Sequence, residues 1–432
     1  MLTVAYLANL FPSPVEPYVG EEIEELRSRG IRVIAGSVRK ATDSPAEAPE
    51  IVLRSLGLPV LVRALWLCLR EWRQISSVVM QVVFGRSERP LQQVKALVHT
   101  WLGACYAVCL AGRGVDHIHM HHGYFGSWIA MVAARLLGVE FSMTLHGSDL
   151  LLLRAYLDVK LKNCAFCFTV SEYNRQYILQ NYPEIEPHKV VVSRLGVAVV
   201  ESFRGFAPRS DAPRSELALL AVGRLHSVKD HAFLVQACAH LREQGVDFEC
   251  SIAGDGPERR HLQSLIRKLG LEARVTLLGH VARDQIDSLY DRANLVVLTS
   301  RSEGIPLVLM EAMSRGKIVL APDITGIPEL VIPGKTGFLY DAGSMEAFVD
   351  RLLFIHSLIQ AECAADHHHS DLNSFLLSAA RQLDWVRHAA RLQVRHNFNR
   401  TTNLKSFGDL FIPRIAAWRE SLPHEDFVLQ QI

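Results

Sequence analysis

The chain has 432 residues, of which 49% are hydrophobic and 21% charged, and this length predicts about two domains rather than one core. Lys and Arg total 46 against 45 for Asp and Glu, so the formal net charge is +1. A net charge this close to zero excludes a positive electrostatic field over the whole surface that would hold nucleic acid or an anionic membrane. Any bound anion must therefore be held by local groups.

The cysteine pattern and the start of the chain both favour the cytoplasm. The eight cysteines are scattered and mostly lie in apolar runs, where cysteine usually behaves as a small hydrophobic residue in a reducing compartment. Residues 1–17 lack a basic region and a small-residue cleavage site, and they alternate like a strand rather than a signal peptide. The apolar stretch at residues 96–112, which has no Asp, Glu, Lys or Arg, is shorter than the roughly 20 residues of a spanning helix. We therefore expect a cytoplasmic protein.

In the first half of the chain, short β-branched runs alternate with amphipathic segments. This rhythm is typical of a parallel sheet with crossover helices and predicts the α/β class. Strands are expected at residues 2–8, 31–37, 115–120, 140–145, 166–170 and 189–193, with helices between them that include 126–137 and 171–180.

Residues 200–216 replace this periodicity with proline, arginine and serine, a composition typical of a linker. A second α/β series follows, and after Ala342 the pattern is mainly helical, with a polar stretch at 362–373 that we interpret as a surface insertion. Two such domains enclose a cleft, and open parallel sheets bind ligands beyond the carboxyl ends of their strands. The second series has strands expected at 217–222, 248–253, 274–278, 295–299 and 317–321, and helices at 230–244, 257–269, 284–292 and 306–315.

The segment "SEGIPLVLMEAM", residues 302–313, joins a strand to a helix that Pro306 is expected to open. The free N–H groups and positive dipole end at the start of such a helix favour phosphate. Glu303 lies in the turn and Glu311 about a turn and a half into the helix, so they do not form a glycosidase pair but can flank an extended nucleotide sugar. Two solvated glutamates are the alternative, because charged residues are mostly exposed.

Two further loops follow strands at the same sheet edge. The first contains Gly223, Arg224 and Lys229, which offer a guanidinium fork and a point charge to a diphosphate. The second is the Gly-Asp-Gly turn that begins at Gly254. Each loop alone is a weak signal, but three glycine-bearing polar loops at successive strand ends predict a binding site.

Taken in order, these motifs resemble the retaining glycosyltransferases of family 4, which have the GT-B architecture. The matching segments are "GRL" with Lys229, "GDGP", Glu303–Gly304 with Glu311, and residues 326–340. In the first half, "HIHMHHG", "TLHGSD" and "TVSEYNR" resemble the same family, in particular the enzymes of bacterial exopolysaccharide and colanic-acid-type assembly.

The resemblance implies two Rossmann-like domains that face a cleft. Residues 1–205 are expected to form the acceptor-side domain and residues 206–385 the nucleotide-sugar-binding domain. Residues 386–432 are expected to be helical and to pack back toward the first domain.

The resemblance also implies roles for single residues. Arg224 and Lys229 neutralise the donor diphosphate, and Glu311 holds the ribose. Glu303 contacts the donor sugar near the reacting centre, and His146 of "TLHGSD" touches that sugar from across the cleft. The donor-binding set is completed by Gly223, Gly254, Gly304, Ile305, Pro306 and Leu307.

The chemistry expected from the family retains the anomeric configuration by departure of the leaving group and attack on the same face, with cations and helix amides stabilising the diphosphate. No protein nucleophile, metal or other cofactor is expected, because Arg and Lys take the place of the ion. The nucleotide-diphosphate sugar is a co-substrate, and the acceptor is a glycan or a polyprenol-linked sugar.

Several positions depart from the common family pattern. The loop after the first strand has Gly20 alone, where a glycine pair is common, so Glu16 and Tyr18 either serve the acceptor or simply shape the loop. Asp149 is a third candidate for the acceptor side. Ala198 and Lys317 stand where aspartate and a small residue are more usual, and neither removes a predicted catalytic group.

The run "DHIHMHHG" superficially resembles a metal site. In a strand, however, His117, His119 and His121 share one face while Asp116 and His122 point the other way, which is poor metal geometry. Structural histidines are the better interpretation, and no metal is assigned.

Residues 61–84 carry Trp66, Trp72 and three arginines among apolar residues. Two interpretations remain open: an interfacial helix near a lipid-linked acceptor, giving peripheral contact with the inner face of the membrane, and an amphipathic helix packed on its own domain.

The leading function is transfer of a sugar to a growing cell-surface glycan. An epimerase or phosphorylase of similar architecture would need acids on both faces of the sugar or a lysine placed for pyridoxal phosphate, and neither arrangement is found. The alternative from another class is a non-catalytic GT-B-fold partner in a polysaccharide assembly complex. Such a scaffold has no need to retain Arg224, Lys229, Glu303 and Glu311 together.

Overall fold

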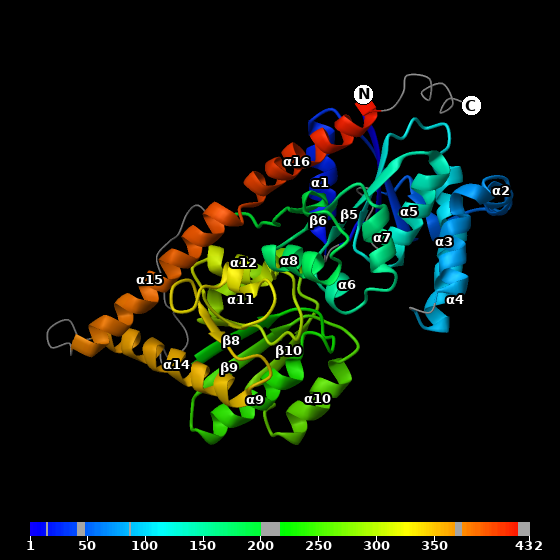
Figure 1. The fold of residues 1–432 in the computed structure, drawn as a ribbon. Helices are drawn as coiled ribbons and strands as arrows, with labels where there is room; N and C mark the ends of the chain where they lie inside the picture. Colours follow the sequence, from blue (N-terminus) through cyan, green and yellow to red (C-terminus); the bar gives the residue numbers. More distant parts are fainter. Residues whose placement is uncertain (14–15, 41–47, 86–87, 200–216, 368–373, 422–432) are drawn as a thin grey trace. The chain divides into compact units, whose positions relative to one another are not determined.

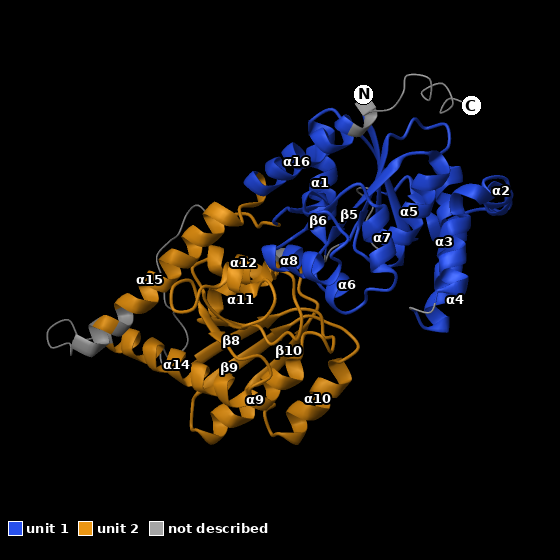
Figure 2. Ribbon diagram, viewed as in Figure 1, with its two compact units in different colours: residues 1–194, 402–432 blue, residues 195–401 orange. Residues whose placement is uncertain are grey.

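A computed structural model describes residues 1–13, 16–40, 48–85, 88–199, 217–367 and 374–421 of the chain (Figure 1). The chain forms two compact units, each with its own parallel sheet. Unit 1 comprises residues 1–194 and the segment that begins at Thr402, and unit 2 comprises residues 195–401 (Figure 2). The linker expected at 200–216 lies outside the described residues.

Unit 1 contains a seven-stranded sheet in the order β3-β2-β1-β4-β5-β6-β7, with all neighbouring pairs parallel. The strand order reverses between β1 and β4, and such a switch point is where open α/β sheets bind ligands. The strands are β1 Thr3–Phe11, β2 Arg32–Lys40, β3 Ile51–Val52, β4 His117–His121, β5 Glu140–Leu145, β6 Cys167–Thr169 and β7 Val190–Val192.

Helices cover both faces of this sheet. One face packs against α2, α3, α4, α5, α7 and α8, and the other packs against α1 and α16. None of the helices in the described ranges of the chain is both long and apolar enough to cross a membrane. The helices are α1 Pro17–Ser28, α2 Leu58–Arg70, α3 Trp72–Phe84, α4 Pro90–Leu110, α5 Phe125–Leu137, α6 Ser148–Leu151, α7 Leu157–Asn163, α8 Glu172–Asn181 and α16 Arg400–Ser421, with short 3-10 helices at Leu53–Ser55 and Pro187–Lys189.

Unit 2 contains a six-stranded parallel sheet in the order β10-β9-β8-β11-β12-β13. β8 and β9 have the predicted bounds because β8 is a continuous apolar run, β9 has buried residues at alternate positions, and each strand is followed by a glycine. The sequence prediction omitted β13, which is only three residues long. The strands are β8 Leu217–Val222, β9 Phe248–Ala253, β10 Val275–Gly279, β11 Leu295–Val297, β12 Ile318–Pro322 and β13 Phe338–Tyr340.

The sheet of unit 2 also has helices on both faces. α9, α10 and α14 bury one face, α11, α12 and α13 bury the other, and α15 contributes to both clusters. Pro306 precedes α12 in an extended conformation (φ −75°, ψ 122°) rather than occupying its first helical position as predicted. The helices are α9 His231–Glu243, α10 Arg259–Lys268, α11 Arg283–Arg292, α12 Leu307–Ser314, α13 Ile327–Leu330, α14 Met345–His367 and α15 Ser374–Asn397.

The unit boundaries differ from the expected ones at 205 and 385. Helix α15 belongs to unit 2 because it buries Val386 and Val394 there, and only α16 returns to unit 1, where Phe407 and Phe411 enter the core. The predicted surface insertion at 362–373 is also partly wrong, since residues 362–367 continue α14 and 368–373 lie outside the described residues. A pairing of the Glu362 carboxylate with an arginine of α15 accounts for this helical extension.

Candidate active site

Three loops of unit 2 leave the carboxyl edge of adjacent strands. They follow β9, β8 and β11, which are neighbours in the sheet. The loops after β8 and β9 are joined by backbone hydrogen bonds, from Gly223 N to Ala253 O at 2.9 Å and from Leu225 N to Asp255 O at 2.9 Å. The predicted donor-binding loops therefore form one surface.

Gly254 has a structural role that the sequence did not reveal. Its φ is +146°, and a Cβ atom there would lie 1.8 Å from the carbonyl oxygen of Gly223. Glycine is required because the two loops approach each other this closely. Its assignment to the donor-binding set stays a prediction.

Lys229 and Glu303 come from different loops and form an ion pair. Lys229 Nζ lies 2.6 Å from Glu303 Oε1, and the two side chains are 23% and 11% exposed. The Lys229 loop is held by a hydrogen bond from Thr299 Oγ1 to the Lys229 carbonyl oxygen, at 3.0 Å. An ammonium has three donors, so two remain free to bind a ligand.

Arg224 lies in the same loop as Lys229 and is exposed. Its guanidinium forms no hydrogen bond or ion pair with any residue that the structure describes. An exposed, unpaired guanidinium beside a lysine can bind a phosphate oxygen in bidentate fashion.

Glu311 lies within α12, and its partner was missed by the sequence analysis. The hydroxyl of Tyr290 in α11 donates to Glu311 Oε2 at 2.9 Å. Burial, followed by the nearby Glu311 charge, raises the pKa of Tyr290 well above its usual value. The hydrogen bond fixes one carboxylate oxygen and leaves Oε1 for a ligand.

The turn between β11 and α12 contains a second missed feature. The hydroxyls of Ser300 and Ser302 are buried without a hydrogen-bond partner in the described part of the chain. Buried polar groups are nearly always paired. These two serines flank Arg301, and Ser302 directly precedes Glu303, so both add polar groups to the loop that also carries Gly304 and the buried Ile305.

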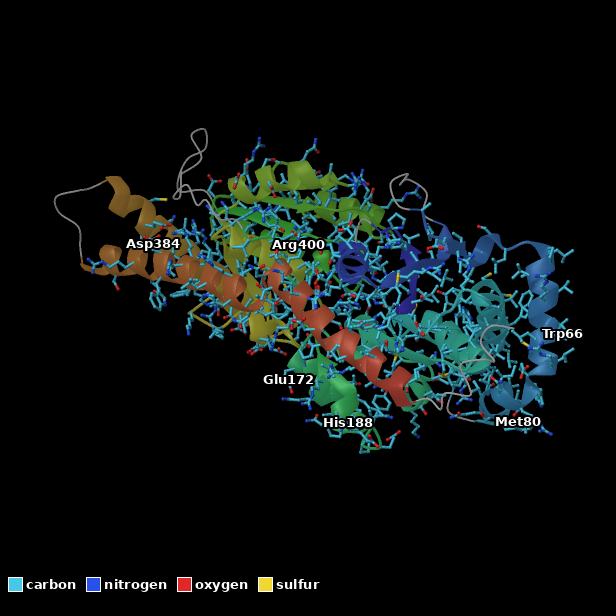
Figure 3. All side chains as sticks on the ribbon, turned by 90° about the horizontal axis from the view of Figure 1, so that it is seen from above. Trp66, Met80, Glu172, His188, Asp384 and Arg400 are labelled. Carbon is cyan, nitrogen blue, oxygen red and sulfur yellow. The ribbon has the colours of Figure 1, made fainter. Side chains whose placement is uncertain are left out.

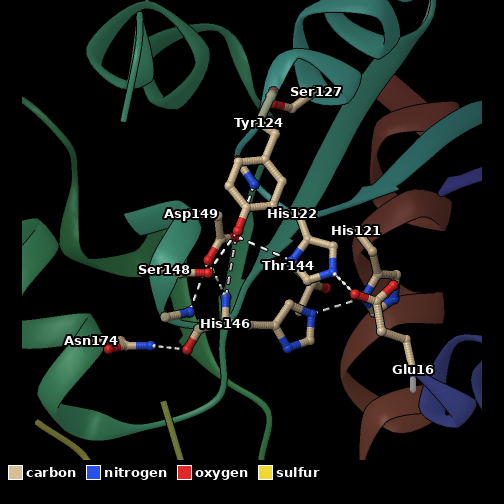
Figure 4. Close-up of polar contacts among 12 residues, drawn as sticks. Glu16, His121, His122, Tyr124, Ser127, Thr144, His146, Ser148, Asp149 and Asn174 are labelled. Atoms are coloured by element: carbon tan, nitrogen blue, oxygen red, sulfur yellow. Dashed lines mark hydrogen bonds and ion pairs between the residues drawn. The ribbon is translucent and has the colours of Figure 1, made fainter. Parts of the chain in front are cut away.

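In unit 1, the predicted residues gather where β1, β4 and β5 end (Figure 4). His146 follows β5, and its Nε2 lies 3.0 Å from Nδ1 of His121. The ring of Tyr18 lies 4.8 Å from the ring of His146. The structure thus places Tyr18 and His146, which the sequence had assigned separately, in contact.

His122 is held between two carboxylates. Its Nε2 lies 3.1 Å from Glu16 Oε1, and its Nδ1 lies 3.6 Å from Asp149 Oδ2. Burial by itself would lower the pKa of His122, but the interactions with Asp149 and Glu16 outweigh it and raise this pKa to about 10. His122 is therefore an imidazolium at neutral pH.

Asp149 is fully buried and accepts hydrogen bonds from backbone amides. Its Oδ1 accepts from Gly147 N at 2.8 Å and His146 N at 3.1 Å, and its Oδ2 accepts from Gly123 N at 2.9 Å. These bonds fix the loops after β4 and β5. They suit Asp149 to positioning His146 rather than to binding an acceptor directly.

His146 stays neutral in this setting. Burial and the positive charge of His122 lower its pKa well below the ordinary histidine value. Asn174 donates to the His146 carbonyl oxygen at 2.8 Å and fixes the loop from the other side. A neutral imidazole can donate at one nitrogen and accept at the other.

The remaining histidines of β4 lie inside the sheet. His117 Nε2 and His119 Nδ1 each lie 2.7 Å from Ser142 Oγ, and His119 Nε2 lies 3.1 Å from Thr144 Oγ1. The possible ligand atoms of Glu22, His119 and His121 lie within 4.8 Å of one another. Hydrogen bonds account for both ring nitrogens of His119, so a metal ion is not needed to explain its burial.

Comparison with known protein families identifies the chain. A model described as "Glycosyltransferase Family 4" matches residues 15–200, and one described as "Glycosyl transferases group 1" matches residues 206–359. The chain belongs to the family 4 glycosyltransferases of the GT-B fold. The family resemblance of the sequence motifs is thereby confirmed.

This family 4 glycosyltransferase is similar to the colanic acid biosynthesis glycosyltransferase WcaL of Escherichia coli (strain K12). The two are 36% identical over 183 residues, which are 41% of this chain and 44% of WcaL. The match therefore spans less than half the length of that relative.

Solved structures show the same fold at low identity. Sucrose-phosphate synthase from Thermosynechococcus elongatus has a TM-score of 0.70 at 17% identity, covering 96% of this chain and 100% of its own. Anabaena HepE, solved in complex with UDP and glucose, has a TM-score of 0.61 at 16% identity, with coverage of 96% and 100%. These matches confirm the predicted α/β class with two Rossmann-like domains.

Proposed function

We propose that this protein is a retaining glycosyltransferase that moves a hexose-type sugar from a nucleoside-diphosphate donor to a growing cell-surface glycan. The observation that carries the proposal is the Lys229–Glu303 ion pair together with the guanidinium of Arg224, which lies in the same loop as Lys229, is exposed and is unpaired within the described residues. It combines cations for a diphosphate with a carboxylate for a sugar at one sheet edge. The relative WcaL supports a glycan as the product, and the HepE complex supports a nucleotide donor.

In the proposed reaction, Arg224, Lys229 and the amide groups at the start of α12 bind the donor diphosphate. The bond between the anomeric carbon and the diphosphate oxygen breaks, and an acceptor hydroxyl forms the new bond on the same face. The acceptor proton goes to the departing diphosphate. Cationic groups stabilise the charge that develops, and neither a protein nucleophile nor a metal is required.

The remaining roles follow from the contacts of each side chain. Glu303 accepts hydrogen bonds from hydroxyls of the donor sugar. Glu311 accepts one from a ribose hydroxyl at Oε1, the oxygen that Tyr290 does not bind. His146 stays assigned to the donor sugar. Glu16 and Tyr18 stay assigned to the acceptor side.

A thermal-shift comparison of UDP, GDP, ADP and CMP in the presence of EDTA tests the proposal. A ligand at 100 times its dissociation constant stabilises the folded state by about 2.7 kcal/mol, which corresponds to a rise of about one to a few degrees in a chain of this length. One clear responder is expected. If the folded protein responds to none of them, the non-catalytic partner becomes the better assignment.

A surface of unit 1 supports placing the reaction at the inner face of a membrane. The outward stripe of α2 consists of apolar side chains at helical spacing, and it is flanked by Arg63 and Arg70. Figure 3 shows Trp66 of α2 and Met80 of α3 at the same end of the unit. An apolar and aromatic stripe with flanking arginines is complementary to an anionic lipid surface. The exposed stripe comprises Leu58, Val62, Leu65, Trp66 and Leu69.

We propose that this stripe docks on anionic lipid, close to a lipid-linked acceptor. The double variant Trp66→Gln with Leu69→Gln is expected to lose co-sedimentation with phosphatidylglycerol liposomes. Trp385→Gln is the matched control, because Trp385 is as exposed as Trp66, at 58%, but lies on α15 of unit 2. Unchanged binding of the double variant would exclude lipid docking by α2. A dimer that only the double variant disrupts would instead assign the stripe to a second copy of the chain.

A further inference from the structure

A small polar cavity lies at the carboxyl edge of the sheet of unit 2, and the reaction proposed above does not use it. Its volume is about 150 Å³, roughly ten times what a single water molecule needs. The loop after β8, the starts of α9 and α10 and the loop after β11 form its walls. The polar side chains that line it include His226, Asp230, His231, Glu258, His261 and Arg301.

The first turn of α9 forms part of the cavity wall, through His231 and Ala232. The backbone amides of these two residues make no hydrogen bond within the described part of the chain. Asp230 occupies the N-cap position, from which an aspartate usually accepts a hydrogen bond from the first turn, but it makes no such bond here. Its Oδ2 lies 2.7 Å from Arg301 Nε instead. Two amide donors therefore remain available to a ligand.

His231 gives independent evidence for a ligand in this cavity. Its side chain lines the cavity and is only 6% exposed, and neither ring nitrogen has a hydrogen-bond partner among the described residues. Burial, followed by the charge of Lys229, lowers the pKa of His231 to about 4, although the nearby carbonyls of Gly223 and Arg224 oppose this shift. The ring is therefore neutral at pH 7 and has one nitrogen that can only accept. Buried polar groups are nearly always paired, so this nitrogen lacks a donor that a ligand can supply.

Two carboxylates add further acceptors to the cavity. The side chain of Glu258 makes no hydrogen bond or ion pair within the ranges that the structure describes. Its backbone amide donates to Leu225 O at 3.0 Å, which holds Glu258 beside the loop after β8. Asp230 uses Oδ2 for Arg301 and leaves Oδ1. The cavity thus combines amide donors with imidazole and carboxylate acceptors.

This combination selects among the possible classes of ligand. Two carboxylates stand against one guanidinium, which is already paired with Asp230, and this balance disfavours phosphate. A metal ion is disfavoured because, among the described residues, the group whose possible ligand atoms converge is Glu22, His119 and His121 of unit 1. A hydroxyl both donates and accepts, so a molecule with neighbouring hydroxyls satisfies both kinds of group.

We propose that this cavity is a second carbohydrate site, which binds a neutral sugar residue through neighbouring hydroxyls. The hydroxyls accept from the amides of α9 and donate to the Glu258 carboxylate and the His231 ring. The lining loop also carries Arg224 and Lys229, so the bound sugar lies beside the donor loops. That this sugar belongs to the growing glycan rests on the proposed glycosyltransferase function, whereas binding of a sugar in the cavity does not.

Saturation-transfer NMR on the full-length protein without nucleotide tests the proposal. The probes are methyl α-D-glucopyranoside, methyl α-D-galactopyranoside and methyl α-D-mannopyranoside, each of which carries neighbouring hydroxyls. At least one is expected to bind, and Glu258→Ala is expected to weaken that binding by about tenfold or more, since it removes a hydrogen bond to a charged group. The melting temperature of the free variant should not change, because the Glu258 side chain has no partner within the described residues.

Glu272→Ala is the matched control, because Glu272 is an exposed glutamate of unit 2 that precedes β10 at the amino end of the sheet. Its substitution should leave sugar binding unchanged. His231→Leu keeps an apolar side chain of similar size and removes both ring nitrogens, so it is expected to abolish binding. If that variant does not fold, Glu258→Ala still decides the proposal.

Glu303→Ala separates this cavity from the donor-sugar site. A sugar in the cavity stays bound in Glu303→Ala and is lost in Glu258→Ala, and the reverse result would overturn the proposal. Failure of all three sugars to bind would also overturn it, as would binding of inorganic phosphate or Zn²⁺ that Glu258→Ala abolishes. The thermal shift with nucleotides tests the proposed function separately, so a protein that binds a nucleotide but none of the sugars keeps that function and loses only this inference.

Discussion

Replacing Glu303 with alanine is expected to lower turnover by about 10²–10³-fold while binding of the nucleoside diphosphate survives. The carboxylate contacts the sugar near the reacting centre in the proposed reaction, whereas the diphosphate is held by cations. The substitution also releases Lys229 from its ion pair, so the affinity for the diphosphate should stay the same or rise. Nucleotide release from the donor and calorimetric titration with the diphosphate measure the two effects.

Glu303→Gln provides the control for this prediction. Glutamine keeps a hydrogen bond to Lys229 but removes the negative charge, so turnover should fall while the loop keeps its conformation. An equal loss of binding and turnover in Glu303→Ala would assign Glu303 to holding the loop in place. Full turnover in that variant would remove Glu303 from the reaction.

Replacing Arg224 with alanine is expected to weaken binding of the nucleoside diphosphate by about 10–100-fold. This factor corresponds to the binding free energy of one charge-assisted hydrogen bond. Because Arg224 is exposed and its guanidinium makes no hydrogen bond or ion pair with a described residue, the melting temperature of the free protein should not change. Titration of wild type and variant with the same nucleotide measures the difference.

Arg274→Ala is the matched control for Arg224→Ala. Arg274 is also an accessible arginine of unit 2, but it precedes β10 and pairs with Asp247 at the amino end of the sheet. Its substitution should leave nucleotide affinity unchanged. Unchanged affinity in Arg224→Ala itself would refute the assigned phosphate site.

Local signals in the sequence located most of the elements. β5, β8 and β9 have the predicted bounds because β8 is a buried apolar run, β5 and β9 carry apolar residues at alternate positions, and each strand ends before a polar residue or glycine. β13 was missed because three residues carry too little periodicity to predict a strand. The end of the second domain was expected at 385 rather than after α15, because the residues against which α15 and α16 pack lie far away along the chain.

The sequence indicated several candidate site residues but not the side chains that bond to them. Arg224, Lys229 and Glu303 could be proposed from the sequence because their loops follow predicted strands. Tyr290 was not found, because it lies within α11 and no local pattern connects it to Glu311. The contacts of His121 were missed for the same reason, since Glu22 and His146 come from other elements.

The sequence by itself determined the α/β class, the two sheets and the set of polar loops, because apolar runs and glycine turns act over a few residues. Only the tertiary structure showed which side chains form hydrogen bonds and ion pairs with one another and where the backbone approaches itself closely. Lys229 joins Glu303, His122 joins Asp149, and Gly254 is needed for the approach of Gly223. These contacts depend on strand order and on segments that are distant along the chain. They produce no periodic pattern in the sequence from which they could be predicted.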